Sequence, residues 1–265
     1  MSVKTSSPNV LYEVRDRVAT ITLNRPGRRN ALSPAMLSDL LQCLATAGAD
    51  PGVRAVVLTG AGERAFCSGL DLGRLAESGA TDLELHAERS LFVDVSLACE
   101  RLGKPLIGCI NGHALAGGFG LALSCDLLIA ADTATFGTPE INVGLWPMMV
   151  MAIIVRNLGR KRAMELFMTG ERVDAVVAQG WGLVNRVVSP DAVRATAHDL
   201  ARSLCEKSPL VMKLGRDAFY RTADQSFEES LRYLHAQLTV VGLTDDAKEG
   251  VAAFLAKRDP TFTGR

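Results

Sequence analysis

The chain has 265 residues, of which 48% are hydrophobic and 22% charged, the balance of an ordinary globular protein with a sizeable core. Lys and Arg together number 29, as do Asp and Glu, so the formal net charge is zero. A neutral chain offers no overall electrostatic attraction to nucleic acid or to a membrane surface, and neither is predicted as a partner.

Six cysteines are scattered through the chain without a Cys-x-x-Cys pair, at positions Cys43, Cys67, Cys99, Cys109, Cys125 and Cys205. We therefore expect free buried thiols in a reducing compartment and no metal site. The first ten residues contain no apolar or Arg-rich amphipathic segment, and no apolar run reaches the roughly 18 residues of a membrane span. The sequence thus predicts a cytoplasmic protein without a targeting signal.

Hydrophobic patterning predicts an α/β fold. Residues 11–24 alternate like two strands joined by a tight turn, Ser33 and Pro34 open a helix, and the apolar run 53–60 indicates a strand buried on both faces. Further strands are expected at 105–111 and 126–132, on either side of a helix that begins at 117. Strands separated by helices favour a parallel sheet.

The remaining pattern is mostly helical. Helices are expected at 159–170 and 174–182, followed by a short strand at 183–188 and helices from 191 onward. We therefore divide the chain into an α/β core, residues 1–200, and a helical C-terminal region, residues 201–265.

Three stretches carry candidate chemistry: GAGERAFCSGLD (60–71), NGHALAGGFG (111–120) and FGTPEINVGLWP (136–147). The first two follow strands, where open α/β sheets bind ligands, and their glycines let the backbone approach a ligand closely. Taken singly, each is also compatible with a tight turn or a solvated carboxylate. Together, paired backbone N–H groups and one carboxylate suit a thioester, whose enolate oxygen each donor stabilises by about 3–4 kcal/mol.

The motifs LNRPGRRNAL, AFCSGLDL, INGHALAGGFGLALSCD, FGTPEINVGLWP, MELFMTG and EGVAAFLAKRDP resemble, in this order, those of the enoyl-CoA hydratase/isomerase (crotonase) family. The resemblance implies a spiral core of ββα units with C-terminal helices that mediate trimer packing, the trimers often pairing into hexamers. It also implies an acyl-CoA substrate and no cofactor beyond its coenzyme A moiety.

Carried over residue by residue, the resemblance assigns the two oxyanion-hole N–H groups to Leu70 and Gly117. Gly69 and Gly118 flank them and are counted with the substrate-binding residues. Ser68 matches the position whose backbone contacts the adenine of coenzyme A.

Charged and aromatic residues complete the predicted substrate contacts. Arg28 and Arg29 match a basic position near the nucleotide phosphates, and Lys257 resembles a tail contact to the same moiety, although solvated surface charges are an equal alternative. Asp71 fits an acidic position for which we favour a structural role. Trp146 follows the predicted catalytic carboxylate and is placed at the substrate.

One departure bears on the reaction. Hydratases of the family typically hold a water with two glutamates twenty residues apart; the second matches Glu140, but the first falls on Gly120, which has no side chain. One carboxylate is sufficient to move a proton from C2 to C4 of a 3-enoyl thioester, and apolar neighbours of Glu140 would raise its pKa. Single-glutamate family members also hydrate, so hydration of a 2-enoyl-CoA and isomerisation of a 3-enoyl-CoA both stay open. If a water site is otherwise intact, Gly120→Glu should raise hydration.

A second departure follows Pro147, where hydratases resemble GAGGT and this chain has Met148-Met149-Val150-Met151-Ala152. The bulky residues indicate either a reshaped acyl pocket or helix packing. Met148 also stands near the position of the aspartate that dehalogenases need, which excludes dehalogenation. Decarboxylation and non-catalytic acyl-CoA binding remain as alternatives.

Overall fold

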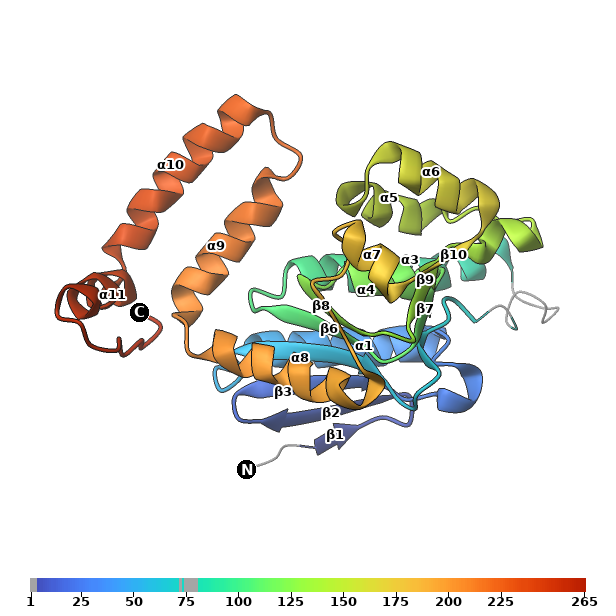
Figure 1. Cartoon of the computed structure of the whole chain (residues 1–265), viewed down its shortest axis with the longest axis horizontal. Coiled ribbons are helices and arrows are strands. Elements are labelled where there is room, and N and C mark those ends of the chain that lie inside the picture. The colour runs from blue at the N-terminus through green and yellow to red at the C-terminus, as the bar shows by residue number, and fades with distance from the viewer. Residues whose placement is uncertain (1–3, 72, 74–80) are drawn as a thin grey trace.

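The computed structural model describes residues 4–71, 73 and 81–265, and its centre is a mixed sheet (Figure 1). The strands follow the order β1-β2-β3-β4-β6-β8-β11. Neighbours are antiparallel from β1 to β3 and parallel from β3 to β11. Their bounds are Lys4–Ser6, Val10–Arg15, Val18–Leu23, Ala55–Gly60, Leu106–Ile110, Leu127–Ala131 and Arg186–Val188.

A second, smaller sheet has the order β10-β9-β7-β5, with strands Arg172–Asp174, Thr135–Gly137, His113–Leu115 and Ala65–Cys67. Strands β5, β7 and β9 each come directly after a parallel strand of the large sheet, and each is followed by helical structure. Three successive ββα units therefore wind into a spiral, which confirms the predicted fold class. The short strands of this second sheet were not predicted.

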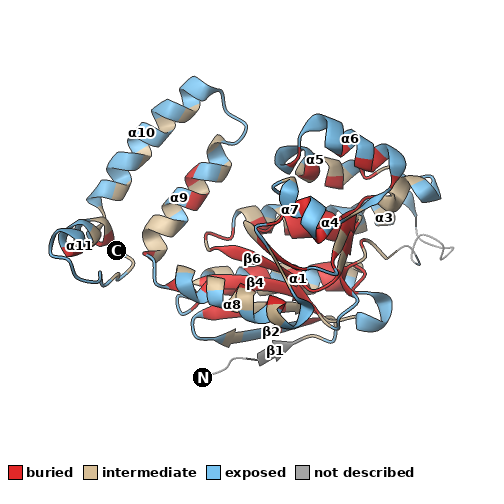
Figure 2. Ribbon diagram, in the orientation of Figure 1, coloured by how far each residue is buried: buried red, intermediate tan, exposed pale blue. Residues whose placement is uncertain are grey.

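Helices cover both faces of the large sheet. On one side lie α1 (Pro34–Ala49), α3 (Asp82–Glu100) and α4 (Gly117–Leu123), and on the other lies α8 (Pro190–Cys205). Strands β4 and β6 are buried at every position, as Figure 2 shows for the middle of the sheet. Helix α8 places apolar residues every fourth position against the sheet, at Val193, Ala197, Ala201 and Cys205.

The remaining helical elements are short. They comprise the 3₁₀ turns η1 (Pro26–Arg28) and η2 (Pro139–Val143) and the helices α5 (Met148–Asn157), α6 (Arg160–Thr169) and α7 (Ala175–Gly180). Ser33 caps α1 by accepting a hydrogen bond from Met36, and Gly170 ends α6 in the left-handed conformation, as the sequence predicts.

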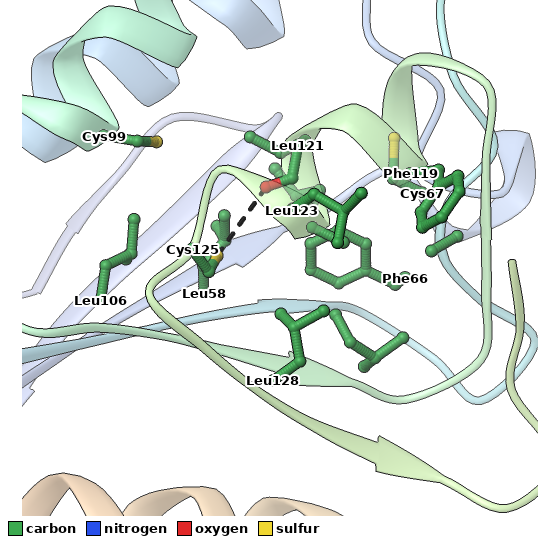
Figure 3. Close-up of a cluster of buried hydrophobic side chains, with 14 of the residues drawn as sticks. Leu58, Phe66, Cys67, Cys99, Leu106, Phe119, Leu121, Leu123, Cys125 and Leu128 are labelled. Atoms are coloured by element: carbon green, nitrogen blue, oxygen red, sulfur yellow. Dashed lines mark hydrogen bonds between the residues drawn. The ribbon is translucent and has the colours of Figure 1, made fainter. Parts of the chain in front are cut away.

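Helix α4 is buried along its whole length, and Figure 3 shows its apolar side chains among those of β4, β5 and β6. The ring of Phe119 lies 5.6 Å from that of Phe136. A Cβ atom on Gly118 would overlap the carbonyl oxygen of Cys67. Glycine at position 118 therefore lets the start of α4 lie directly against the end of β5.

The predicted division of the chain at residue 200 needs correction, because α8 runs through that position to Cys205. The carbonyl oxygen of Cys205 accepts hydrogen bonds from Arg17 and Arg54, which precede β3 and β4. The chain thus leaves the core at the amino edge of the parallel strands. From there α9 (Pro209–Thr222), α10 (Phe227–Leu243) and α11 (Asp245–Leu255) extend away from it (Figure 1).

All six cysteines are free, as predicted, and five of them are buried. Within the described residues, no group of three or more His, Cys, Asp or Glu side chains is arranged to hold a metal ion. No helix in the same part of the chain is both long and apolar enough to cross a membrane.

A buried ion pair attaches α9 to the core. The Nε of Arg216 donates to Asp126 at 2.8 Å, and its guanidinium also donates to the carbonyls of Cys99 and Glu100. The hydroxyl of Tyr220 donates to the same carboxylate at 2.6 Å. The Arg216 side chain is only 6% exposed, so its removal would leave Asp126 poorly compensated.

We predict that Arg216→Met lowers the free energy of unfolding by about 3–5 kcal/mol, the usual cost of breaking a buried pair from one side. Arg232→Met removes an exposed pair with Glu228 and should leave the urea midpoint unchanged. Urea unfolding of both variants checks this, and equal midpoints would show that Arg216 does not anchor α9.

Candidate active site

The backbone around Leu70 turns its N–H toward the start of α4. Leu32 donates to the carbonyl of Gly69 at 2.8 Å and accepts from the N–H of Asp71 at 3.0 Å. Because these bonds use the groups on either side of Leu70, its own N–H points away from Leu32. A Cβ atom on Gly117 would lie only 3.5 Å from the Leu70 nitrogen. The two predicted oxyanion donors are therefore neighbours.

Two unusual backbone conformations make this approach possible. Gly69 has φ +97°, and a Cβ there would lie 2.7 Å from the Cβ of Ala116 and 3.1 Å from the Gly117 nitrogen. Ala116 itself has φ +53°, a strained value for a residue with a side chain. Its N–H donates to the carbonyl of Gly137 at 2.9 Å. Gly117 then begins α4, where an N–H has no acceptor within the helix.

Two buried asparagines, which the sequence analysis did not single out, hold the loop that leads to Leu70. Asn30 donates to the carbonyls of Ala61 and Ala65, at 3.0 and 2.9 Å. Asn111 accepts from the N–H of Gly60 at 3.0 Å. Both lie inside the quoted motifs, and for Asn111 the available signal was a polar residue directly after a buried strand.

Asp71 pairs with Arg25 at 3.0 Å, with both side chains mostly buried. Arg25 also donates to the carbonyl of Ala31 at 2.8 Å. This pair joins the segment after Leu70 to the loop before α1, consistent with the structural role favoured for Asp71. Its assignment to substrate binding stays a prediction.

Glu140 belongs to the segment that is hydrogen-bonded to Ala116, the residue before Gly117. It follows Gly137, the acceptor for Ala116, by three residues, a span of at most about 10 Å. Its Oε2 atom is buried and has no hydrogen-bond partner among the described residues. Burial raises the pKa of Glu140, and a hydrogen bond from its own backbone N–H offsets part of that increase. The group is thus a stronger base than a solvated carboxylate.

Trp146 ends the same segment. Its ring lies 6.0 Å from that of Phe167, and its half-buried side chain packs against the core. Its predicted contact with substrate stays a prediction.

Apolar side chains pack against Gly120, the position that matches the first glutamate of two-glutamate hydratases. A Cβ atom on Gly120 would lie 3.1 Å from Cζ of Phe92, and 3.2 and 3.3 Å from the two methyl groups of Val150. Contacts this short force the neighbours to move even for alanine. A glutamate at this position therefore requires Phe92 or Val150 to shift, and the expected gain in hydration from Gly120→Glu stays a prediction.

The predicted nucleotide contacts lie together on the surface. The N–H of Ser68 donates to the carbonyl of Arg29 at 3.1 Å, so Ser68 adjoins the turn that carries Arg28 and Arg29. Both arginines are exposed, and Arg29 lines a cavity of about 450 Å³ together with Arg64. Gly118, by contrast, packs against Cys67, so its contact with substrate stays a prediction.

Lys257 lies elsewhere. It follows α11, which lies beyond the amino edge of the large sheet, whereas Arg28 follows the carboxyl end of β3 and Ser68 that of β5 (Figure 1). Within one chain Lys257 is therefore not brought together with the other predicted contacts. A second copy of the chain would have to supply it.

A spiral of ββα units of this kind is the architecture of crotonase-type enzymes. The model of the family described as enoyl-CoA hydratase/isomerase matches residues 13–265. A putative enoyl-CoA hydratase from Thermus thermophilus is 39% identical over 258 residues, covering 94% of this chain and 98% of that protein. A probable enoyl-CoA hydratase from Mycobacterium leprae is 36% identical, with 97% and 98% covered.

The crystal structure of an enoyl-CoA hydratase from Mycobacterium smegmatis superposes with a TM-score of 0.92 at 37% identity, covering 97% of this chain and 99% of that one. The chain therefore belongs to the enoyl-CoA hydratase/isomerase family, whose members act on acyl-CoA substrates.

We predict that Gly69→Ala lowers turnover of an enoyl-CoA by about 100-fold or more, the effect of losing one oxyanion donor. The added Cβ would collide with Ala116 and push the Leu70 and Gly117 amides apart. Gly62→Ala is the matched control, since Gly62 also has a positive φ but its Cβ would meet only Pro26 at 3.5 Å. Steady-state kinetics of both variants check this; equal losses would mean that backbone strain alone is responsible.

Proposed function

We propose that the protein isomerises 3-enoyl-CoA to 2-enoyl-CoA, with Glu140 as the one acid/base and the Leu70 and Gly117 amides as an oxyanion hole. The observation that carries this proposal is that, within the part of the chain that the structure describes, Glu140 has a buried carboxylate oxygen with no hydrogen-bond partner, while apolar side chains lie against the position of Gly120. One group that takes and returns a proton is sufficient for isomerisation.

In the proposed reaction, the Glu140 carboxylate removes a proton from C2 of the 3-enoyl thioester. The electrons of the broken C–H bond spread over the conjugated system to the thioester oxygen, which the amides of Leu70 and Gly117 stabilise by about 3–4 kcal/mol each. Protonated Glu140 then delivers the proton to C4, and the double bond moves to C2–C3. The carboxylate is restored, so no cofactor is required beyond the substrate's coenzyme A moiety.

Hydration of 2-enoyl-CoA is the second candidate, because the similar proteins named above are called enoyl-CoA hydratases. Here Glu140 would activate a water for attack at C3 and then protonate C2. Decarboxylation and acyl-CoA binding without turnover are further outcomes that an assay can reveal.

The coenzyme A moiety is proposed to lie along the carboxyl edge of the sheet. Ser68 and Gly69 would offer backbone contacts to the adenine side, and exposed Arg28 and Arg29 would face the phosphates. Lys257 would reach the same moiety from a neighbouring copy. A cytoplasmic location stays a prediction.

We predict that Glu140→Gln lowers kcat by about 10²–10⁴-fold and leaves the affinity for an acyl-CoA product unchanged. Because the base must be ionised, kcat/KM should fall as the pH drops through the raised pKa of Glu140, at a higher pH than for a solvated glutamate. Glu165→Gln, the same change at an exposed position, is the control.

Two assays run in parallel separate the candidates. Appearance of the conjugated thioester absorbance from a 3-enoyl-CoA supports isomerisation, and its loss from a 2-enoyl-CoA supports hydration. Turnover of neither substrate by a protein that binds coenzyme A would favour the non-catalytic binder. Full activity of Glu140→Gln on its true substrate would remove Glu140 as the base.

We also propose that the chain forms a homotrimer, or a hexamer of paired trimers, through its C-terminal helices. Helix α10 has no buried residue, and Figure 2 shows it exposed along its length. It nevertheless carries the exposed apolar side chains Phe227, Leu231, Leu234, Leu238, Val240 and Leu243. An apolar face of this extent is typical of an interface between copies.

Analytical ultracentrifugation should give the wild type at three or six times the mass of the chain. Leu238→Asp, at a side chain that is 71% exposed, should shift it toward the monomer, because a charge cannot be buried unpaired in an apolar interface. Thr239→Asp introduces the same charge at the next exposed position and should leave the assembly intact. A monomeric wild type would contradict the proposal.

A further inference from the structure

Three helices meet at Gly120, next to the two converging amides. Phe92 comes from α3 and Val150 from α5, and both close on Gly120 of α4 at the distances of 3.1–3.3 Å given above. We call this pair of side chains the Phe92–Val150 wall. Phe92 is 1% exposed and Val150 is 5% exposed, so both side chains are packed inside the protein.

The wall borders the predicted reaction site. Gly117 and Gly120 are three residues apart on α4 and therefore share one helix face. A Cβ atom on Gly117 would lie 3.5 Å from the Leu70 nitrogen and 3.6 Å from Cε2 of Phe92. One ring thus adjoins both the amide pair and the position from which a second carboxylate would extend.

Apolar groups at this position have a chemical consequence. A water molecule fixed for attack needs two to four polar partners, and the phenyl ring and the valine methyls supply none. A Cβ atom at position 120 would already lie 3.1–3.3 Å from the wall, so a glutamate there requires Phe92 or Val150 to shift by a few tenths of an ångström.

We propose that the Phe92–Val150 wall determines the reaction specificity of the site, favouring proton transfer by Glu140 over addition of water. This inference rests on the proposed function, in which Glu140 is the acid/base. Phe92 and Val150 are specificity residues that act by occupying space, and we assign them no contact with the reacting atoms.

The first test is a double-mutant cycle on stability. Gly120→Glu should lower Tm by about 5 °C, the usual effect of overpacking a core. Val150→Ala removes the two methyl groups nearest to position 120, so Gly120→Glu/Val150→Ala should recover at least half of that loss. Val193→Ala is the control, because Val193 is similarly buried but packs on the opposite face of the sheet. Combined with Gly120→Glu, it should recover nothing.

The second test measures both reactions. The ratio of hydration to isomerisation should rise about tenfold or more in Gly120→Glu/Val150→Ala relative to the wild type and to Val150→Ala alone. This readout separates specificity from packing, because a purely structural role would restore Tm without changing the ratio. If Gly120→Glu does not accumulate as folded protein, Gly120→Asp, which is one methylene shorter, replaces it in both tests.

The outcomes are distinguishable. If the Tm changes of Gly120→Glu and Val150→Ala are additive and the wild type isomerises, the wall does not restrict position 120. The proposed function would then still hold. A restored Tm with an unchanged ratio would overturn its role in specificity. A wild type that only hydrates, or that turns over neither substrate, would overturn the proposed function and the role of the wall with it, whatever the Tm values show.

Discussion

The close approach of two backbone segments, the end of β5 and the start of α4, is the constraint on which the site depends. Gly118 allows it on one side, because any Cβ there would overlap the carbonyl of Cys67, and Gly69 allows it on the other. The large sheet alone does not bring these segments together. The small sheet does, since β5 pairs with β7, which leads directly into α4. The ββα spiral therefore serves chemistry by placing successive strand ends side by side.

Order at this junction comes from polar groups satisfied inside an apolar surrounding. At the end of β4 and in the loop after it, the side chains of Asn30 and Asn111 form hydrogen bonds with backbone groups that have no partner strand. The ion pair between Arg25 and Asp71 holds the segment after Leu70 in place. Each of these groups is paired. Glu140 is the contrasting case, since its buried Oε2 has no partner within the described residues. A carboxyl held without a partner is available to exchange a proton, at a cost in stability when it is ionised.

Sequence patterns predicted the elements whose signals are local. The apolar run of β4, the Ser33 cap of α1 and the helix stop at Gly170 each follow from neighbouring residues. The three-residue strands β5, β7, β9 and β10 were missed because they are too short for alternation to show. Likewise, the contact between Phe92 and Gly120 results from tertiary packing between residues far apart in the sequence. The glycine motif alone therefore could not predict it.

Water exclusion and base strength are connected through burial. Apolar side chains near a carboxylate withdraw the solvent that would stabilise its charge, and burial is the main cause of the raised pKa of Glu140. A second carboxylate in the same site would be a like charge and would raise the pKa of Glu140 further. It could also share a proton with Glu140, and a site without it lacks both effects. A one-carboxylate site must therefore obtain its basicity from desolvation. The glycine at position 120 and the valine at position 150 depend on each other in packing, because a Cβ atom on Gly120 would lie 3.2 and 3.3 Å from the two valine methyl groups.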